Sequence, residues 1–313
     1  MTATPLLISR EEVQELLDWD SLCVATREGL IVAANPPPGS ATSVQVVYSD
    51  GSLHLKAASL EPQRIISVKS NLRPSHGGVS GLLLAYDLDT EQISGIIDAS
   101  LMTALRTGAI AAVAAEHFVR ERDVRVAVLG VGPVGEQSIR GLLRTLAISE
   151  VRLWSSHGRR SQQLADQLAR TVRTLVCQTV NEAIANADVI VTATPTTEPI
   201  LVSPPPHDGT LILAMGADTV GKRELSANIL RNADIIADVP DDAIRVGESA
   251  YLEQSRWNEV SALGHWLATD TVPPLHRPLL VVDSVGSSHV DAAVTSVIMT
   301  RARDRGESTS VEL

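Results

Sequence analysis

Aromatic side chains and cysteines are scarce in this chain of 313 residues. Aromatic residues make up 3% of the sequence, as four Trp, three Tyr and one Phe, which leaves few platforms for stacking nucleic-acid bases. The two cysteines, Cys23 and Cys177, lie far apart and lack neighbours at metal-binding or redox spacing. We therefore expect no disulfide framework and no metal site, and we expect a cytoplasmic protein.

Positive charge and long apolar runs are also lacking. The 26 Lys and Arg residues against 37 Asp and Glu residues give a formal net charge of −11. Nucleic acids and anionic membranes both require a basic protein surface, so neither is an expected partner. No apolar run approaches the roughly 18 residues that a membrane span needs, and the start MTATPLLISREEVQELL passes quickly into charge. We expect no spanning helix and no signal peptide.

From residue 124 onward, short Val/Ile/Leu-rich runs alternate with amphipathic segments. Examples of the apolar runs are VRVAVLG, DVIVTAT and LLVVDSVG. Strands that are apolar on both faces and alternate with helices are typical of a parallel sheet covered by helices on both sides. This part of the chain is therefore predicted to be an α/β domain with a doubly wound parallel sheet.

The first 115 residues have a different pattern. A helix is predicted over residues 9–18, followed by the break NPPPGS and by alternating segments such as VQVVYSDGSLHLKAA. Such alternation predicts an antiparallel or mixed sheet. An alanine-rich helix follows in LMTALRTGAIAAVAAEHFVRER, and another helix is predicted near the end of the chain. We expect one domain of residues 1–115 with the C-terminal helix of about 288–305, and a second of residues 116–287.

A glycine-rich motif follows the first parallel strand. Its glycines permit a tight turn and the close approach of a pyrophosphate, whose charge would lie at the N-terminus of the next helix. The strand before it and the helix after it are the context that a dinucleotide-binding loop requires. The same residues would also suit a ligand-free turn of an α/β sheet. The predicted cofactor residues here are Gly130, Gly132, Pro133, Val134 and Gly135.

The residues at the end of the second parallel strand normally determine whether NAD or NADP binds. A carboxylate at this place binds the ribose 2′-hydroxyl of NAD, yet residues 154–160 read WSSHGRR and contain no acid. The hydroxyls of Ser155 and Ser156 and the guanidinium groups of Arg159 and Arg160 suit a 2′-phosphate. This pattern favours NADP(H), with NAD(H) as the alternative, because both arginines would equally suit the solvated start of the next helix.

Three charged residues form a second candidate set. Lys69 lies in ISVKSN, Arg106 in TALRTG and Asp218 in MGADTVGKREL. Taken singly, they could be a strand-edge lysine, a helix-surface arginine and a helix cap. Asp218 stands out because it follows the predicted strand TLILAMGA, and the C-terminal ends of parallel strands face the ligand crevice of this fold.

Together these segments resemble the ornithine cyclodeaminase/mu-crystallin family over essentially the whole chain. The resemblance rests on ISVKSN, LMTALRTGAIAAVAA, VLGVGPVG, AMGADTVGKREL with NILRNADI, and VVDSVG. The family includes amino-acid cyclodeaminases, cyclic ketimine reductases, alanine dehydrogenases and mu-crystallin. It implies a Rossmann-type domain beside a smaller α+β domain that binds substrate and forms a homodimer.

The resemblance also implies roles for individual residues. Lys69 and Arg106 match the residues that hold the substrate carboxylate, Asp218 matches the acid at the substrate nitrogen, and Val285 falls beside the substrate side chain. These three charged residues are the expected catalytic residues. Besides the glycine motif and the Ser/Arg segment, the implied cofactor contacts are Thr107, Thr194, Met215, Lys222 and Ser284.

Two departures from the family pattern shape the functional hypotheses. Cyclodeaminases carry a further carboxylate-binding arginine, but this chain has no Lys or Arg between Arg27 and Lys56, and Ser155 replaces their NAD-selecting aspartate. We therefore expect a reductase or dehydrogenase that transfers hydride at the α-carbon of a small amino acid or cyclic imino acid. The alternatives are an ornithine or lysine cyclodeaminase that releases ammonia and recycles its cofactor, and a non-catalytic ligand-binding protein.

Overall fold

The computed structural model describes residues 4–74, 78–120, 123–205, 207–306 and 309–310, and the chain forms two compact units. The first unit comprises Met1–Arg106 with Ser287–Leu313, and the second comprises Thr107–Gly286. The division falls inside the alanine-rich helix α3 (Ala99–Phe118), whereas the sequence placed the boundary after residue 115. The reason is close packing within the second unit, where a Cβ added at Gly108 would lie 2.6 Å from the carbonyl carbon of Gln137.

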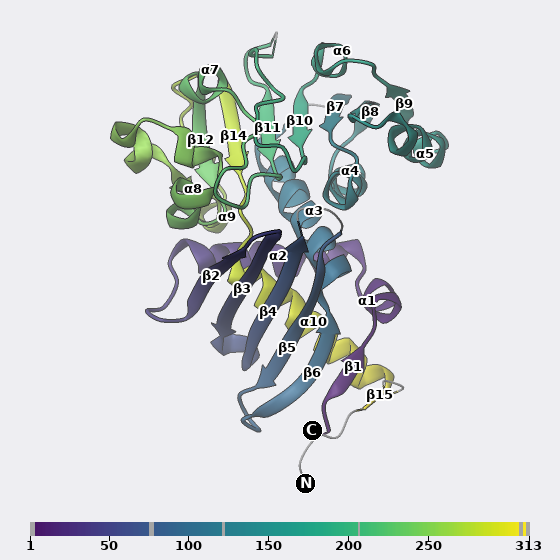
Figure 1. The fold of residues 1–313 in the computed structure, drawn as a ribbon, viewed down its shortest axis with the longest axis vertical. Coiled ribbons are helices and arrows are strands. Elements are labelled where there is room, and N and C mark those ends of the chain that lie inside the picture. Colours follow the sequence, from purple (N-terminus) through teal and green to yellow (C-terminus); the bar gives the residue numbers. More distant parts are fainter. Residues whose placement is uncertain (1–3, 75–77, 121–122, 206, 307–308, 311–313) are drawn as a thin grey trace. The chain divides into compact units, whose positions relative to one another are not determined.

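The second unit contains an eight-stranded sheet whose strand pairs are all parallel. Its strand order is β13-β12-β14-β11-β10-β7-β8-β9 (Figure 1). The order reverses between β7 and β10, as in the doubly wound Rossmann pattern, so the predicted fold class is confirmed. The strands are β7 (Val124–Leu129), β8 (Ile148–Trp154), β9 (Arg173–Val176), β10 (Val189–Thr192), β11 (Leu211–Ala214), β12 (Ala233–Ala237), β13 (Ser261–Ala262) and β14 (Leu279–Asp283).

The central strands of this sheet are buried on both faces. Every residue of β10, β11 and β14 is buried, including Ile190, Ile212 and Val281 in the hydrophobic core. Helices joining consecutive strands exclude water from such a sheet, which explains the continuous apolar runs in the sequence. Besides α3, the helices are α4 (Pro133–Thr145), α5 (Gly158–Leu168), α6 (Val180–Ile184), α7 (Ala227–Arg231), α8 (Pro240–Val246) and α9 (Leu263–Thr269), with 3-10 turns η2 (Glu248–Tyr251) and η3 (Gln254–Glu259).

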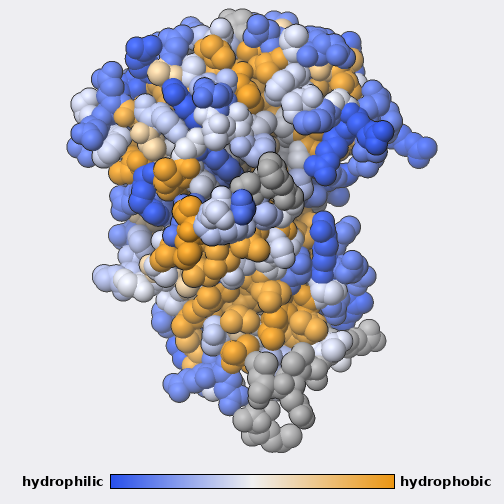
Figure 2. All heavy atoms as spheres, viewed as in Figure 1, coloured by the Kyte–Doolittle hydropathy of each residue, from blue (hydrophilic) through white to orange (hydrophobic). Residues whose placement is uncertain are grey.

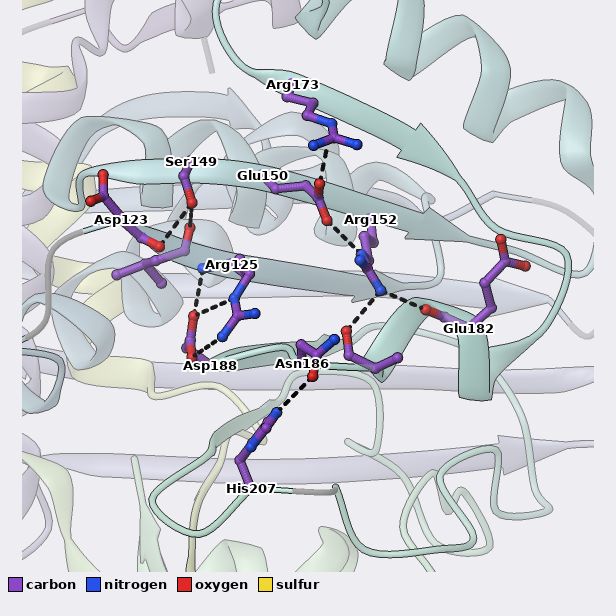
Figure 3. Close-up of polar contacts among 12 residues, drawn as sticks. Asp123, Arg125, Ser149, Glu150, Arg152, Arg173, Glu182, Asn186, Asp188 and His207 are labelled. Atoms are coloured by element: carbon purple, nitrogen blue, oxygen red, sulfur yellow. Dashed lines mark hydrogen bonds and ion pairs between the residues drawn. The ribbon is translucent and has the colours of Figure 1, made fainter.

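A polar network ties the amino-terminal parts of several of these strands together (Figure 3). The backbone N–H of Arg125 on β7 donates to Asp188, which precedes β10, at 2.8 Å. On β8, Arg152 binds Glu150 at 2.6 Å and donates to the carbonyl oxygen of Ala185 at 2.7 Å. Arginine and carboxylate neighbours satisfy one another here, so this network stabilises the sheet at the ends opposite the glycine motif.

The first unit contains a mixed seven-stranded sheet, as the alternating pattern predicts. Its order is β15-β1-β6-β5-β4-β3-β2, in which β1 and β6 are parallel and the other neighbours are antiparallel. Alternate residues of β3 and β4 are buried, so one face of the sheet is covered. The strands are β1 (Leu6–Ile8), β2 (Ala41–Tyr48), β3 (Gly51–Leu60), β4 (Ile65–Pro74), β5 (Ser80–Asp87), β6 (Gln92–Asp98) and β15 (Thr309–Ser310), with a 3-10 turn η1 (Glu61–Gln63).

Helix α10 (Ser288–Arg305) covers the buried face of this sheet and packs closely on α2 (Trp19–Ala34) (Figure 1). A Cβ added at Gly29 of α2 would lie 2.6 Å from Cα of Val290. The sequence predicted a single helix over residues 9–18, but α1 (Arg10–Leu16) ends earlier and α2 was not anticipated. Asp18 separates the two helices, because its carboxylate accepts from the N–H of Ser21 and caps the start of α2.

The opposite face of the same sheet carries exposed apolar side chains, visible as an apolar area in Figure 2. They are Val44, Val46, Leu72 and Leu82, each about half exposed, on β2, β4 and β5. A continuous apolar face of this kind is typical of an interaction surface. In the described parts of the chain, no helix is both long and apolar enough to cross a membrane.

Candidate functional site

The glycine motif forms a tight turn between β7 and α4. Gly130 has φ +101°, and a Cβ there would lie 2.6 Å from both the carbonyl oxygen of Ala193 and Cγ2 of Thr194. A Cβ at Gly135 would overlap the carbonyl oxygen of Gly130. Both positions therefore require glycine, because a side chain at either would clash with backbone.

The same turn leaves room for a ligand at the start of α4. Nothing lies within 4 Å of a Cβ added at Gly132, the N-cap residue, which supplies no side-chain hydrogen bond to the helix. Pro133 occupies the first turn, where its lack of an N–H costs nothing. The N-terminal N–H groups and the positive end of the helix dipole suit an anion, so these residues fit the pyrophosphate of a dinucleotide.

The segment after β8 is polar and exposed. Ser155 Oγ lies 2.8 Å from Ser161 Oγ, and Ser156 Oγ lies 2.9 Å from Nδ1 of His157. Arg159 and Arg160 lie in the first turn of α5, which contains no acid. Among the residues that the structure describes, neither arginine forms an ion pair, so both guanidinium groups are available for an anionic ligand.

A buried carboxylate, Glu224, joins the ends of β10 and β11. Its Oε1 accepts from the N–H and the hydroxyl of Thr194 at 2.6 and 2.7 Å, and its Oε2 accepts from Thr192 Oγ1 and the N–H of Gly216. Burial raises the pKa of Glu224, while these four donors favour the ionised form. Thr194 and the residue that follows Met215 are therefore both fixed by Glu224.

Three further buried carboxylates extend this arrangement along the carboxyl ends of the strands. Glu248 accepts from the N–H groups of Glu224 and Leu225 at 2.5 and 3.1 Å. Asp283, the last residue of β14, accepts from the N–H of Glu248 and from the N–H and hydroxyl of Ser249. Burial raises the pKa of Asp283 to about 7 and that of Glu248 well above its usual value.

The fourth buried carboxylate, Asp238, follows β12 and holds the segment after β14. It accepts from Ser284 Oγ at 2.8 Å and from the N–H groups of Val285 and Gly286 at 3.1 and 2.7 Å. Sequence reasoning did not identify these four acids. For Asp238 and Asp283 the available signal was an acid placed at or just after the end of an apolar strand, as in DIIAD and LLVVD, whereas Glu224 and Glu248 carry no such signal.

Asp218 follows β11 and forms an ion pair with Lys222. Lys222 Nζ lies 2.8 Å from Asp218 Oδ1, and Thr219 Oγ1 donates to the same oxygen at 3.2 Å. Both charged side chains are partly exposed. The structure therefore brings together two residues to which the resemblance gave separate roles, one toward the substrate and one toward the cofactor.

Lys69 and Arg106 meet at a third residue, Asp291 of α10. Lys69 Nζ lies 2.5 Å from Asp291 Oδ2, and Arg106 Nε lies 3.1 Å from Asp291 Oδ1. All three side chains are almost fully buried. Burial lowers the pKa of Lys69 well below its usual value, and Arg106 adds to this effect while Asp291 opposes it. Lys69 is therefore not an exposed strand-edge lysine, and Arg106 is not an exposed arginine on a helix surface.

The predicted residues thus fall into two groups, one in each unit. In the first unit, Lys69 and Arg106 share Asp291, which sequence reasoning missed because it lies within the apolar helix sequence HVDAAVTSVIM. In the second unit, the glycine motif contacts Thr194, and Thr107 is buried in α3. Among the described residues, no group of three or more His, Cys, Asp or Glu side chains is placed to hold a metal ion.

A Rossmann-type sheet with an open glycine loop, together with a buried pair of cations, defines a dinucleotide-binding class of α/β protein. The model of the ornithine cyclodeaminase/mu-crystallin family matches residues 10–306, and the chain belongs to this family. The resemblance inferred from the sequence motifs is confirmed.

The individual relatives have low sequence identity to this chain. The iminosuccinate reductase of Paracoccus denitrificans is 27% identical over 231 residues, which cover 73% of this chain and 72% of that protein. The ketimine reductase mu-crystallin of Rattus norvegicus is 26% identical over 260 residues, which cover 78% of this chain and 82% of that protein. An archaeal alanine dehydrogenase dimer with bound NAD has a similar fold, with a TM-score of 0.89 at 24% identity and 99% coverage of both chains.

Proposed function

We propose that this protein is an NADP(H)-dependent oxidoreductase that transfers a hydride at the α-carbon of a small amino acid or imino acid. The observation that carries the proposal is the buried pair Lys69 and Arg106. Two cations that share one carboxylate retain a net positive charge, which suits the carboxylate of such a substrate. Membership of the family, and relatives named iminosuccinate reductase and ketimine reductase, support this class of reaction.

The cofactor is assigned to the second unit. The loop at Gly130, Gly132 and Gly135 would hold the pyrophosphate, and Arg159 with Arg160 would bind the 2′-phosphate of NADP(H). The further cofactor contacts, as the resemblance implies, would be Thr194, Met215 and Ser284. A bound nicotinamide supplies hydride transfer, and the protein supplies binding and orientation.

The substrate roles follow from charge and hydrogen-bonding capacity. Lys69 and Arg106 would hold the carboxylate, which fixes the orientation of the neighbouring α-carbon. Asp218 would hold the substrate nitrogen and exchange a proton with it at Oδ, while Lys222, at 2.8 Å, stabilises the carboxylate that remains. Val285 would limit the size of the substrate side chain.

A substrate panel tests this proposal. Purified protein is assayed at 340 nm with NADPH or NADH and with pyrroline-2-carboxylate, piperideine-2-carboxylate, pyruvate plus ammonia, or oxaloacetate plus ammonia. We expect oxidation of NADPH with at least one of these substrates and a preference over NADH. If neither cofactor is oxidised with any of them, the proposal is wrong.

Substitution of Asp218 tests its role in the reaction. Asp218→Asn keeps the shape of the side chain but removes the proton exchange, so we expect kcat to fall by about 100-fold or more, the usual range for a lost acid–base group. NADPH affinity, measured by fluorescence titration, should stay within about twofold. Asp208→Asn, at an exposed acid of the same unit, is the matched control and should retain full activity. Full activity in Asp218→Asn would exclude this residue from the chemistry.

A cyclodeaminase is the second candidate, and it is favoured by the Asp218–Lys222 pair beside the strand end. Its signature is release of ammonia from L-ornithine or L-lysine with no net change at 340 nm. Measuring ammonia and absorbance in the same samples separates the two reactions. A non-catalytic binding protein would show neither signal, and Asp218→Asn would leave its ligand affinity largely intact.

We also propose that the protein is a homodimer formed through the apolar face of the first unit. Val44, Val46, Leu72 and Leu82 share this face of the sheet and are each about half exposed. Burying such a face against a second copy would stabilise the assembly through the hydrophobic effect. The structurally similar archaeal alanine dehydrogenase is described as a dimer, which supports a dimeric state.

A further inference from the structure

We propose that Asp291 is a positioning residue for the carboxylate-binding pair Lys69 and Arg106. It keeps Lys69 protonated and orients both cations so that their remaining donors face the substrate. The inference rests on the substrate role proposed above for these two cations. Asp291 itself would not touch the reacting atoms.

The geometry assigns one oxygen of Asp291 to each cation. Oδ2 lies 2.5 Å from Lys69 Nζ on β4, and Oδ1 lies 3.1 Å from Arg106 Nε on α3. The contact at Nε leaves both Nη atoms of the guanidinium for another acceptor, and Lys69 Nζ carries three hydrogens. A substrate carboxylate can therefore bind both cations without displacing Asp291.

The position of Asp291 is itself fixed by α10. Its N–H donates to Ser287 at 3.1 Å, and Thr295 Oγ1 donates to its carbonyl oxygen at 2.6 Å. The neighbouring helix α2 packs directly on this turn, because Gly29 lies against Val290. Asp291 is 1% exposed, so bulk water screens its attraction for Lys69 only weakly.

The charges around Lys69 explain why a counter-ion is needed. Burial lowers the pKa of Lys69, and Arg106 of α3 and Lys56, its register partner on β3, lower it further. Asp291 of α10 raises it, while β5 presents the uncharged Leu83 opposite Lys69.

Asp291 stays ionised in these surroundings. Burial raises its pKa, but Lys69, Arg106 and Lys56 together lower it below its usual value. His289, two residues away on α10, lies 3.1 Å from Ser40 Oγ, and burial lowers its pKa. With Asp291 ionised and Lys69 protonated, this cluster keeps a surplus of positive charge, to which Lys56 adds, and such a surplus suits a substrate carboxylate.

Asp291→Asn tests the inference through the pH dependence of KM. The nearly isosteric amide removes the counter-ion, so Lys69 should lose its proton at a lower pH. We expect KM for the imino acid to rise by about tenfold between pH 6 and pH 9, as the charge of Lys69 is lost. In the wild type, where Asp291 opposes the lowering of the Lys69 pKa, KM should rise less over the same range.

Two further variants separate charge from packing. Asp291→Glu keeps the charge, so its KM should depend on pH as that of the wild type does, even if its value increases. Asp304→Asn removes the same charge from an exposed position on α10 and should behave as wild type. NADPH affinity, measured by fluorescence, should be unchanged in all variants, which also shows that they are folded.

The inference is overturned if KM of Asp291→Asn changes with pH no more than that of the wild type, or if Asp291→Glu acquires the same pH dependence as the amide. Calorimetric binding of pyrrole-2-carboxylate, a stable planar ring carboxylate, provides the same comparison without turnover. A wild-type protein that binds this compound but oxidises no NADPH would refute the proposed reaction and still test Asp291. If Asp291→Asn does not fold, the pH profile of Asp291→Glu decides.

Discussion

Arg159 and Arg160 are the side chains that carry the proposed choice of NADP(H) over NAD(H). They lie together in the first turn of α5, and Ser155, just after β8, stands where the resemblance implies the NAD-selecting aspartate of ornithine cyclodeaminase. An aspartate would repel a 2′-phosphate, whereas two exposed guanidinium groups attract it. The proposed preference for NADP(H) therefore rests on two exposed side chains.

Removing these guanidinium groups should change cofactor preference. In Arg159→Ala and in Arg160→Ala we expect KM for NADPH to rise about tenfold, the effect of losing one charge-assisted hydrogen bond. KM for NADH should change by less than about twofold, because NADH lacks the 2′-phosphate. Arg170→Ala, at an exposed position just after α5, is the matched control. Equal losses for both dinucleotides would show that the arginines do not contact the 2′-phosphate.

Individual residues also show how far sequence reasoning reaches. Gly130 and Gly135 were identifiable because a tight turn and close backbone contact exclude any side chain, a local requirement. Asp291 was not identifiable, because the sequence around an acid in an apolar helix does not indicate which residues that acid contacts in the fold. Its role depends on Lys69 and Arg106, which reach it from a strand and a helix far away in the sequence.

The strands and loops of the second unit are held at their carboxyl ends by four buried acids. Glu224 joins β10 to β11, Asp283 joins β14 to the turn at Ser249, and Asp238 holds the segment after β14. Backbone N–H groups and hydroxyls, rather than arginines or lysines, satisfy these carboxylates. Burial raises the pKa of Glu224, Glu248 and Asp283, and the stability of this unit should therefore depend on pH.

Asp283 gives this dependence a definite sign. Its pKa is about 7 in the folded protein and 3.8 as the ordinary value, so the folded state binds the proton more tightly. The contribution to stability is present below about pH 4 and is lost as pH rises through 7. We expect the free energy of unfolding to fall by up to about 1.4 kcal/mol per pH unit in this range from this group.

Chemical denaturation of the wild type and of Asp283→Asn between pH 4 and pH 8 measures this effect. The amide cannot titrate, so the difference in unfolding free energy between the two proteins should vary with pH across that window. The variant is expected to be less stable at every pH, because one of its side-chain atoms becomes a donor facing Ser249. A constant difference across the window would show that Asp283 does not titrate there.

The strands of the second unit were predicted correctly, whereas helix α2 was missed, and the difference has a physical reason. The apolar runs of β7, β10 and β14 were unmistakable, because a strand covered on both faces needs no polar side. Helix α2 was missed although its buried residues recur at helical spacing. Small residues such as Ala25, Gly29 and Ala33 bury little area and give a weak hydrophobic signal, yet they allow α10 to pack closely.

At the scale of the whole molecule, the exposed apolar face of the first unit is the feature to test. Leu82→Glu places a charge within the proposed dimer interface, so we expect the protein to sediment as a monomer in analytical ultracentrifugation. Val202→Glu, at an exposed position of the second unit, is the control and should leave the dimer intact. A wild-type monomer, or a dimer that survives Leu82→Glu, would contradict the proposed interface.

The sequence by itself determined the two sheet types, the glycine loop and the family, because each depends on residues adjacent in the chain or on the period of apolar positions. Only the tertiary structure revealed that Lys69 and Arg106 share Asp291, that Asp218 pairs with Lys222, and that buried acids join the strand ends. Ion pairs and buried hydrogen bonds form between groups brought together by folding. Burial then decides their strength and their pKa, and burial is a property of the folded chain.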